Sequence, residues 1–486
     1  MACQDLREFL DRLEKAGELQ RISVEVDPHL EIAEITDRMS KLPGGGTALL
    51  FERVKGSRFP AATNLFGSTR RTCAALELEE LSQLTRRMTE LVQRETTGDQ
   101  HDAVAVLANS PEFTRFKPVA VGSGACQEVQ EQFPDLTRYP FLRNWPGDGL
   151  PGDDGRFITL PLVITRDPVS GVANCGIYLV QVLSPDSAGI FWRPESGGGR
   201  HLAAYRAREE RMPVAIVLGG DPALVYSALM PLPADVDEMQ FAGFLRQEPI
   251  ELVPCLTSGI MVPAHAELVI EGYLDPGETV RGGGYGNHTG YYSPERDVPV
   301  MHVTCITRRS EPILPATVIG RPPMEDCHMA KVAERLMLPL TQLRLPEVVE
   351  MNLPLEGIFH GAAIVSITKK FPGHARKVMK TLWNEGWLRG SRLLVVVDGD
   401  ADVHDLSGVF WKVLNSVNWE RDLVSADSPG TEEPAGPQLP FGGRLGIDAT
   451  RKLPGEGVAA WPREVAMDSD IKELVTRRWR EYGFHE

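Results

Sequence analysis

The segment from Arg281 to Tyr292 combines a mobile backbone with side chains that form hydrogen bonds. It reads RGGGYGNHTGYY, and its glycines allow a ligand to approach the main chain closely. Asn287, His288 and Thr289 add donors and acceptors to that backbone. Neither a Walker A motif nor a GxGxxG motif between strand and helix is present, so a phosphate loop of these types is not indicated. A flexible surface turn also fits the glycines, whereas the Asn-His-Thr triplet favours a ligand-facing loop.

Two other segments carry oxygen atoms suited to a cation. Asn174 lies in the run ANCGIYL, where a buried amide needs either a hard cation or backbone groups at a strand end as partners. The acidic run Asp235-Val236-Asp237-Glu238 opens an expected helix, and the helix dipole alone explains it.

Basic side chains gather near residue 370. This patch is either a solvated face or a contact for a phosphate or carboxylate group. Its members are Lys369, Lys370, His374, Arg376 and Lys377.

The composition is that of an ordinary globular chain. Its 486 residues are 42% hydrophobic and 24% charged, and at roughly 100–200 residues per domain they suggest about three domains. A net charge of −16 argues against a general nucleic-acid-binding face. We expect neither a secretion signal nor a membrane-spanning segment, because no sufficiently long apolar stretch occurs. The seven scattered cysteines form no CxxC motif. This pattern favours a reducing cytoplasmic setting and argues against a disulfide framework.

The order of expected elements predicts a mixed α/β fold. Helical spacing of apolar residues predicts helices over 5–17 and 75–98, with a strand at 48–51. The stretch 138–156 is rich in Pro, Gly and Asp and indicates a loop at a domain boundary. Short β-rich runs then follow to about residue 315 and are typical of a barrel or sandwich.

Two features complete this organisation. Two helices within 221–246 interrupt the β-rich runs, and α/β alternation resumes after residue 325. The expected later elements are helices at 325–337, 372–387, 404–416 and 468–481, strands at 362–368 and 391–400, and an extended arm at 426–463. The resulting domains are 1–114, 115–315 and 316–486.

Taken together, these segments resemble the UbiD family of carboxy-lyases, most closely members from menaquinone or ubiquinone biosynthesis. The resemblance runs through nearly the whole chain in one order of motifs. These are DLREFLDRLEKAGEL, ANCGIY, GGDPA, MPLP, FAGFLR, VPAHAELVIEGYLDPGE, GNHTGYY, VIGRPPMED, KKFPGHARKVM and GIDATRKLPGE.

The resemblance implies an N-terminal α/β domain, a central split β-barrel that binds flavin, and a C-terminal α/β domain used in dimerisation. It also implies prenylated FMN, supplied by a flavin prenyltransferase, with Mn²⁺ or Mg²⁺ and K⁺ near the flavin phosphate. The implied reaction is the reversible decarboxylation of a small aromatic or α,β-unsaturated acid. The assembly would be a homodimer or a hexamer.

The resemblance also assigns metal-binding and flavin-binding roles to particular positions of this sequence. The resemblance places the family's metal-binding Asn and Glu at Asn174 and Glu238, and puts Glu195 where the family has a His. A carboxylate ligand suits Mn²⁺ or Mg²⁺, and His201 is the substitute if the alignment shifts. The implied flavin contacts are Ile177, Tyr178, Leu179, Phe191, Trp192, Arg193, Ser196, Gly197 and Met230, with Arg193 as a phosphate partner.

The catalytic positions differ from the family pattern. The family's Arg, which holds the substrate carboxylate, is Leu179 here, and its two acidic residues are Gly282 and Asn287. Asn donates no proton near neutral pH, and Leu binds no carboxylate. Arg281 and His288 are candidate replacements, because a guanidinium suits a carboxylate and an imidazole titrates near neutrality.

Three interpretations therefore remain. The first is a prenylated-FMN decarboxylase or carboxylase with a rearranged site. The second is the same fold with a different flavin-dependent reaction. The third is a catalytically divergent paralogue that serves as the partner or structural subunit of an active decarboxylase.

Overall fold

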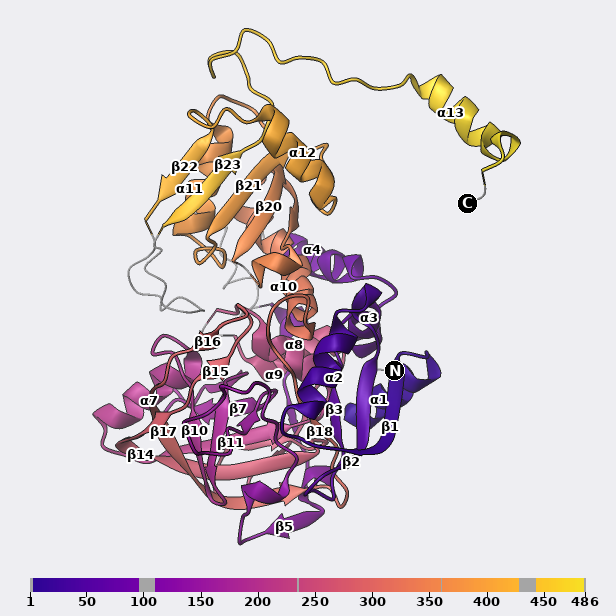
Figure 1. Ribbon diagram of the computed structural model, residues 1–486. Coiled ribbons are helices and arrows are strands. Elements are labelled where there is room, and N and C mark those ends of the chain that lie inside the picture. The colour runs from indigo at the N-terminus through magenta and orange to yellow at the C-terminus, as the bar shows by residue number, and fades with distance from the viewer. Residues whose placement is uncertain (1–2, 96–109, 234–235, 360, 428–442, 485–486) are drawn as a thin grey trace.

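A computed structural model describes residues 3–95, 110–233, 236–359, 361–427 and 443–484 (Figure 1). It has the expected mixed α/β class: the N-terminal region lies beside a β-rich centre, and the C-terminal α/β region lies above both in the view of Figure 1. None of the described helices is both long and apolar enough to cross a membrane. The expected end of a helix at 98, Asp235 and most of 426–442 lie outside the described residues.

The N-terminal region is a small mixed sheet covered by helices. Its sheet order is β1-β2-β3-β18, so a strand from beyond the β-rich centre completes it. Helix α1 forms as expected: Asp5 accepts hydrogen bonds from the Arg7 and Glu8 amides, and the apolar face is buried. The elements are α1 (Leu6–Lys15), β1 (Leu19–Val26), α2 (Glu31–Ser40), β2 (Ala48–Val54), β3 (Ala61–Thr63), α3 (Thr69–Leu76), α4 (Ser82–Glu95), α6 (Pro111–Thr114) and β18 (Leu314–Pro315).

The single helix expected over 75–98 is wrong in its first part. Helix α3 ends at Leu76, because Glu77 takes a left-handed conformation with φ of 52°. A short turn follows, and α4 begins at Ser82. The two helices share one apolar periodicity in sequence, which concealed the break between them.

The centre contains one large, mostly antiparallel sheet. Its order is β6-β9-β10-β17-β14-β11-β7-β8, with β5 on β17, and in the described residues this path does not close into a ring. The two helices expected within 221–246 are α8 and α9. A third helix, α7, was not expected, because its first residues are glycines. The larger elements are β7 (Leu162–Arg166), β8 (Ala173–Gly176), β9 (Val180–Ser184), β10 (Ser187–Ile190), α7 (Gly197–Ala207), β11 (Met212–Leu218), α8 (Pro222–Leu229), α9 (Glu238–Arg246), β14 (Leu268–Gly282) and β17 (Arg296–Arg308).

Shorter strands edge this centre. A small sheet has the order β13-β12-β4, and β15 pairs with β16 across the glycine-rich segment. These strands are β4 (Val119–Ala120), β5 (Val129–Glu131), β6 (Phe157–Ile158), β12 (Glu251–Pro254), β13 (Met261–Pro263), β15 (Tyr285–Gly286) and β16 (Tyr292–Ser293).

The C-terminal region has the expected α/β alternation. Its sheet order is β19-β20-β21-β23-β22, and the apolar strand β21 lies centrally with parallel neighbours on both sides. Helix α10 runs longer than expected and packs against α4. The elements are α10 (Glu325–Arg344), β19 (Val348–Asn352), β20 (Ala362–Ile367), α11 (His374–Asn384), β21 (Leu393–Asp398), α12 (Leu406–Ser416), β22 (Leu423–Ala426), β23 (Arg444–Asp448) and α13 (Ser469–Arg478).

The last part of the chain leaves the body of the molecule. The extended arm expected over 426–463 is wrong in part, because Arg444–Asp448 forms strand β23 inside the sheet. Only after β23 does the chain run as an arm, which ends in α13 apart from the rest (Figure 1). Helix α13 buries none of its residues. Because an isolated helix of this length is unstable in water, it requires a surface to pack against.

Candidate functional site

Asn174 and the first turn of α7 meet in close contact. The Asn174 Oδ1 atom lies only 1.6 Å from where a side-chain Cβ would stand at Gly197. Tyr178 joins them, since its hydroxyl accepts hydrogen bonds from Asn174 Nδ2 and from the Gly198 amide, both at 3.3 Å. Glycine at 197 is therefore what allows this amide to sit at the helix N-terminus.

Glu238 lies beside the same strand. Its Oε2 accepts a hydrogen bond from the Cys175 amide at 3.1 Å, which places it next to Asn174 along β8. Asp237 caps α9 through the Met239 and Gln240 amides, so Glu238 begins the helix. Burial raises the pKa of Glu238 to about 7, while the nearby Arg200 acts in the opposite direction. A cation bound at this carboxylate would offset the free-energy cost of burying its charge.

The other two predicted metal ligands occupy different surroundings. Glu195 is exposed just before α7, and its carbonyl oxygen accepts a hydrogen bond from Arg200 at 2.7 Å. His201 is buried, and its Nδ1 lies 2.8 Å from the Thr165 hydroxyl, which stands opposite Asn174 in the β7–β8 pairing. Burial lowers the pKa of His201, so a neutral, ligand-competent imidazole is favoured.

The predicted flavin residues gather around this pair. Ile177, Tyr178 and Leu179 follow β8 and are partly exposed. The Trp192 ring stands edge-on to the Tyr178 ring, with 5.9 Å between the ring centroids. Ser196 caps α7 by accepting a hydrogen bond from the Gly199 amide. Buried Met230 ends α8, and exposed Arg193 lies just before α7.

Gly282 and Arg281 belong to opposite faces of β14. A Cβ at Gly282 would lie 2.7 Å from the Phe191 ring, so that ring fills the space beside Gly282. Since neighbouring strand residues alternate, Arg281 faces the other way. Its half-exposed guanidinium lies 3.5 Å from Glu295 and 3.6 Å from Asp297.

Asn287 is engaged in its own turn. The buried amide donates from Nδ2 to Ser293 Oγ at 2.7 Å, and its Oδ1 accepts from the Thr289 amide and hydroxyl. Next to it, His288 is partly buried and stands edge-on to Phe359 of the C-terminal region at 5.4 Å. The glycine-rich segment is thus an ordered loop whose imidazole faces the neighbouring region.

Asp148 anchors that loop, although the sequence indicated only an interdomain linker around it. Its carboxylate accepts hydrogen bonds from the Gly286, Trp145 and Asn144 amides, at 2.8, 2.9 and 3.1 Å. Burial raises its pKa to about 6. Stretch 138–156 is therefore irregular, as expected, and it contacts both neighbouring regions, since Leu142 bridges to Phe157 of the central sheet and Arg143 to His29 of the N-terminal region. The domain boundary expected within it stays a prediction. The glycines of both segments, which pack closely here, were the sequence feature that could have indicated the contact between them.

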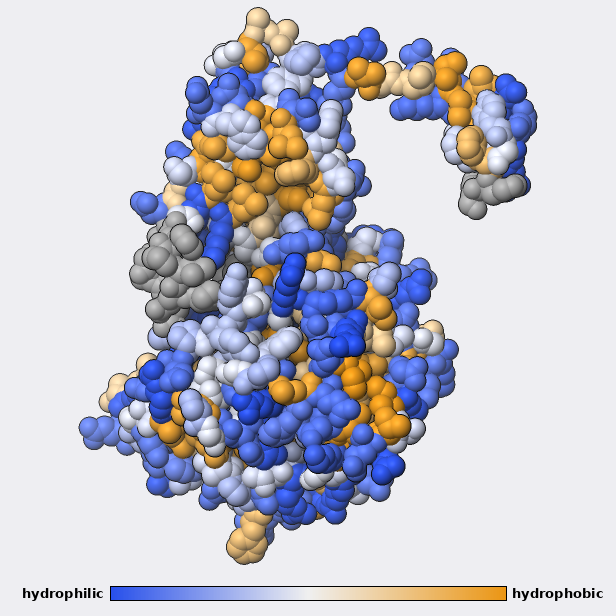
Figure 2. Space-filling model, in the orientation of Figure 1, coloured by the Kyte–Doolittle hydropathy of each residue, from blue (hydrophilic) through white to orange (hydrophobic). Residues whose placement is uncertain are grey.

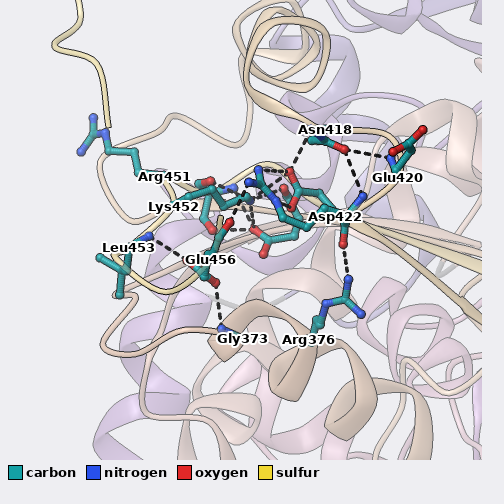
Figure 3. A network of polar contacts seen from close by, with 12 residues as sticks. Gly373, Arg376, Asn418, Glu420, Asp422, Arg451, Lys452, Leu453 and Glu456 are labelled. Atoms are coloured by element: carbon teal, nitrogen blue, oxygen red, sulfur yellow. Dashed lines mark hydrogen bonds and ion pairs between the residues drawn. The ribbon is translucent and has the colours of Figure 1, made fainter. Parts of the chain in front are cut away.

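The basic patch near residue 370 is tied into the C-terminal region itself. Lys369 is buried against Glu456 at 2.6 Å, and His374 and Lys377 both contact Glu347. Figure 3 shows how such contacts hold the start of the arm, with Glu456 accepting from the Gly373 and Leu453 amides. These partners favour a structural role for the patch.

Models of the three domains of one family match most of the chain. They are the N-terminal, Rift-related and C-terminal domains of 3-octaprenyl-4-hydroxybenzoate carboxy-lyase, over residues 10–91, 117–322 and 327–449. The chain belongs to the UbiD family. An uncharacterized protein of Archaeoglobus fulgidus is 42% identical over 99% of both chains, and one of Aquifex aeolicus is 40% identical over the same shares.

Solved structures of UbiD-class enzymes share the fold. The enzyme HmfF of Pelotomaculum thermopropionicum, in complex with FMN, is 28% identical with a TM-score of 0.79, covering 97% of this chain and 99% of that one. Its evolved dimeric form, in complex with prFMN, is 26% identical with a TM-score of 0.77 over 97% and 98%. Vanillic acid decarboxylase of Sedimentibacter hydroxybenzoicus, in its closed form, is 24% identical with a TM-score of 0.84 over both complete chains.

Proposed function

We propose that this UbiD-family chain is a carboxy-lyase that uses prenylated FMN and a divalent metal. The reaction is the reversible, non-oxidative decarboxylation of a small aromatic or α,β-unsaturated acid. The observation that carries the proposal is the meeting of Asn174, the α7 N-terminus and Glu238 in one place. The likeness to HmfF, described with prFMN and with FMN, supports the choice of cofactor.

The residues present fit such a cofactor. Asn174 and Glu238 offer oxygen ligands for Mn²⁺ or Mg²⁺, and Glu195 or His201 would complete the set from α7 and the residues before it. The α7 N-terminus, where the helix dipole favours phosphate, begins with three glycines that leave room for a close approach. The Gly198 and Gly199 amides donate to Tyr178 and Ser196 and would exchange these partners to bind the phosphate. Arg193 and a K⁺ ion would balance further phosphate charge. When bound, prenylated FMN supplies an electron sink for the pair left as CO₂ departs.

The chain's own acid–base group is proposed to be His288. It is the nearest titratable side chain to Asn287 in the loop, and it would supply the proton that replaces CO₂. Leu179 has no group that binds a carboxylate. Asn287 uses its amide group for hydrogen bonds within its own turn. Arg281 would reach a substrate carboxylate only after exchanging Glu295 and Asp297 as partners.

A second function has its own supporting observation. Phe191 closes the space at Gly282, and Asn287 has its hydrogen bonds satisfied within its loop. Both fit a divergent paralogue that acts as a partner or structural subunit of an active decarboxylase. A different flavin-dependent reaction on the same fold is the third alternative.

The proposed setting is the cytoplasm, with a flavin prenyltransferase supplying the cofactor and no role for nucleic acid. We also propose a homo-oligomer, built from a dimer through the C-terminal region. Large apolar side chains are exposed on α12, and Figure 2 shows apolar surface over this region. The residues are Leu406, Phe410, Trp411 and Leu414. Patches of this kind mark interaction surfaces.

The first test is cofactor loading. The chain is co-expressed with a flavin prenyltransferase, supplied with Mn²⁺ and purified without oxygen, and the bound ligand is identified by absorption and mass. Near-full prenylated FMN is expected, with loss in Glu238→Gln and retention in the exposed control Glu278→Gln. A folded protein without flavin would refute the cofactor proposal and favour the partner-subunit function.

The second test is turnover. The loaded protein is screened with aromatic and acrylic acids for CO₂ release and for exchange of labelled CO₂. We expect His288→Ala to lose turnover while keeping flavin. Full turnover in that variant would remove His288 from the mechanism. Loaded protein without any exchange would contradict the carboxy-lyase proposal.

A further inference from the structure

Two neighbouring carboxylates are buried where α10 begins. Glu325 is 2% exposed and Asp326 is 6% exposed. Each has one oxygen in use: Glu325 Oε2 accepts from the Phe66 amide at 3.0 Å, and Asp326 Oδ1 accepts from the Cys327 amide at 2.9 Å. The other oxygens, Glu325 Oε1 and Asp326 Oδ2, are buried without a hydrogen-bond partner.

Two neutral side chains add unpartnered oxygens in the same region. Asn144 Oδ1 and Thr317 Oγ1 are both buried and make no hydrogen bond. Asn144 Nδ2 lies 3.3 Å from both the Thr317 carbonyl oxygen and the Tyr285 hydroxyl. The Thr317 hydroxyl lies beside the Glu325 carboxylate without reaching hydrogen-bonding geometry, and Asp326 acts electrostatically on Tyr285. Contacts and electrostatic interactions thus connect the four side chains through one interior region.

Positive charge is scarce there. Arg71 is the cationic side chain that acts on Glu325, but its guanidinium donates to the Gly45 and Gly46 carbonyls and to Glu18. Burial raises the pKa of both Glu325 and Asp326, as expected for carboxylates with too little counter-charge. A buried acceptor without a donor costs free energy, so each of these four oxygens calls for an ion or a water molecule as its partner.

We propose that Asn144, Thr317, Glu325 and Asp326 form an all-oxygen binding site for a hard cation. Oxygen-only ligands with two carboxylates suit K⁺, Na⁺, Mg²⁺ or Ca²⁺ rather than softer metals. The ion would join the loop after β3, the central domain and α10, which meet at these residues. The site is separate from Asn174 and Glu238 on β8 and α9, and it does not depend on the proposed reaction.

A second group of possible metal ligands lies on β14 and β17. Asp275, Glu278 and His302 bring ligand atoms within 4.8 Å of one another, beside the irregularity in the middle of the β14–β17 pairing. Glu278 is exposed, and the other two are partly buried. Arg211 pairs with Asp275 at 2.6 Å, and Glu278 pairs with His302 at 2.6 Å. Its charges are already matched, and it serves as a control.

The test uses the full chain after removal of metals with a chelator. It is dialysed against K⁺, Na⁺, Mg²⁺ or Ca²⁺ singly, and bound metal is counted by mass spectrometry while the melting temperature is followed. In Glu238→Gln, which removes a ligand of the proposed cofactor metal, one equivalent of one cation is expected to bind and to raise the melting temperature. Glu238→Gln and Asp275→Asn should keep this ion, whereas Asp326→Asn should weaken it by about tenfold or more.

Two results would overturn the site. One is wild-type protein that binds none of the four cations, which leaves ordered water as the partner of these oxygens. The other is binding that Asp326→Asn leaves unchanged. If Asp326→Asn fails to fold, Thr317→Val removes one ligand at nearly constant volume and must weaken the same ion. Loss of flavin or of activity in any variant bears only on the proposed function, since cation binding is measured directly.

Discussion

At the scale of single residues, the candidate site depends on what Gly197 lacks. Any side chain there would occupy the position of Asn174 Oδ1, at 1.6 Å from the Cβ. Sequence comparison identified Asn174 and Glu238 as a pair, and the contact through Cys175 places them on the same strand edge. The steric role of Gly197 was not visible in the sequence, because it depends on the approach of two distant segments.

Gly197→Ala is therefore expected to displace the Asn174 amide while the fold persists. The added methyl group must push Asn174 away, so Mn²⁺ affinity and flavin occupancy should both fall by about tenfold or more. Mn²⁺ titration and flavin absorbance measure this. Gly259→Ala is the matched control, since a Cβ at Gly259 meets no atom within 4 Å. Equal metal affinity in both variants would show that Asn174 is not a ligand.

Asp148 gives a residue-level prediction about pH. Its pKa in the folded state is about 6 because of burial, against about 4 in the unfolded chain. The folded state therefore binds the proton more tightly, and this stabilisation is complete below about pH 4 and is lost as the pH rises through 6. The two-unit difference corresponds to about 3 kcal/mol in the free energy of unfolding.

The substitution Asp148→Asn tests this directly. The amide keeps only one acceptor oxygen for three backbone donors, which costs about 1–3 kcal/mol, and it does not titrate. The stability difference from wild type should be largest near pH 4 and smaller by about 3 kcal/mol at pH 7. Urea unfolding at each pH measures it, with the exposed Asp11→Asn as control. A pH-independent difference would contradict the prediction.

At the scale of elements, periodicity predicted helices and strands better than their interruptions. Helix α1 and strand β21 follow from apolar spacing that burial confirms. The break between α3 and α4 depends on the left-handed conformation of Glu77. Neither the helical spacing nor the residue type predicted that conformation. Stretch 138–156 was correctly expected to be irregular, but its composition says nothing about the packing that Asp148 provides. Tertiary contacts decide such positions.

The root of the arm contains a buried ion network. Lys452 is 1% exposed, and its Nζ lies 2.9 Å from Asp448 and 3.6 Å from Asp422 (Figure 3). Lys452→Met keeps the aliphatic volume but leaves these carboxylates without their shared cation. We expect the C-terminal region to lose about 3–5 kcal/mol of stability in urea unfolding. Lys472→Met on exposed α13 is the control, and an equal effect of both would contradict a role for burial.

At the scale of the whole molecule, two apolar surfaces lack a partner within the described residues. One is the exposed face of α12, and the other is on α13 and the residues after it, including Ile471, Leu474 and Trp479. The arm carries α13 away from its own body (Figure 1), so a second copy of the chain is the simplest surface for it. The sequence indicated the arm by its composition, but the distance that separates α13 from the core is a property of the folded chain.

Disrupting α12 should therefore change the assembly and not the fold. Trp411 is 51% exposed, and Trp411→Glu places a charge where we propose that two copies meet. Sedimentation velocity should show the wild type as a dimer or larger and the variant as a monomer, with unchanged circular dichroism. Phe133→Glu is the matched control, because Phe133 is 91% exposed on the central region, away from α12. If both variants sediment as the wild type does, α12 is not the interface. A monomer in the Trp411 variant alone, by contrast, assigns the contact to the C-terminal region, because the two added carboxylates differ only in their location.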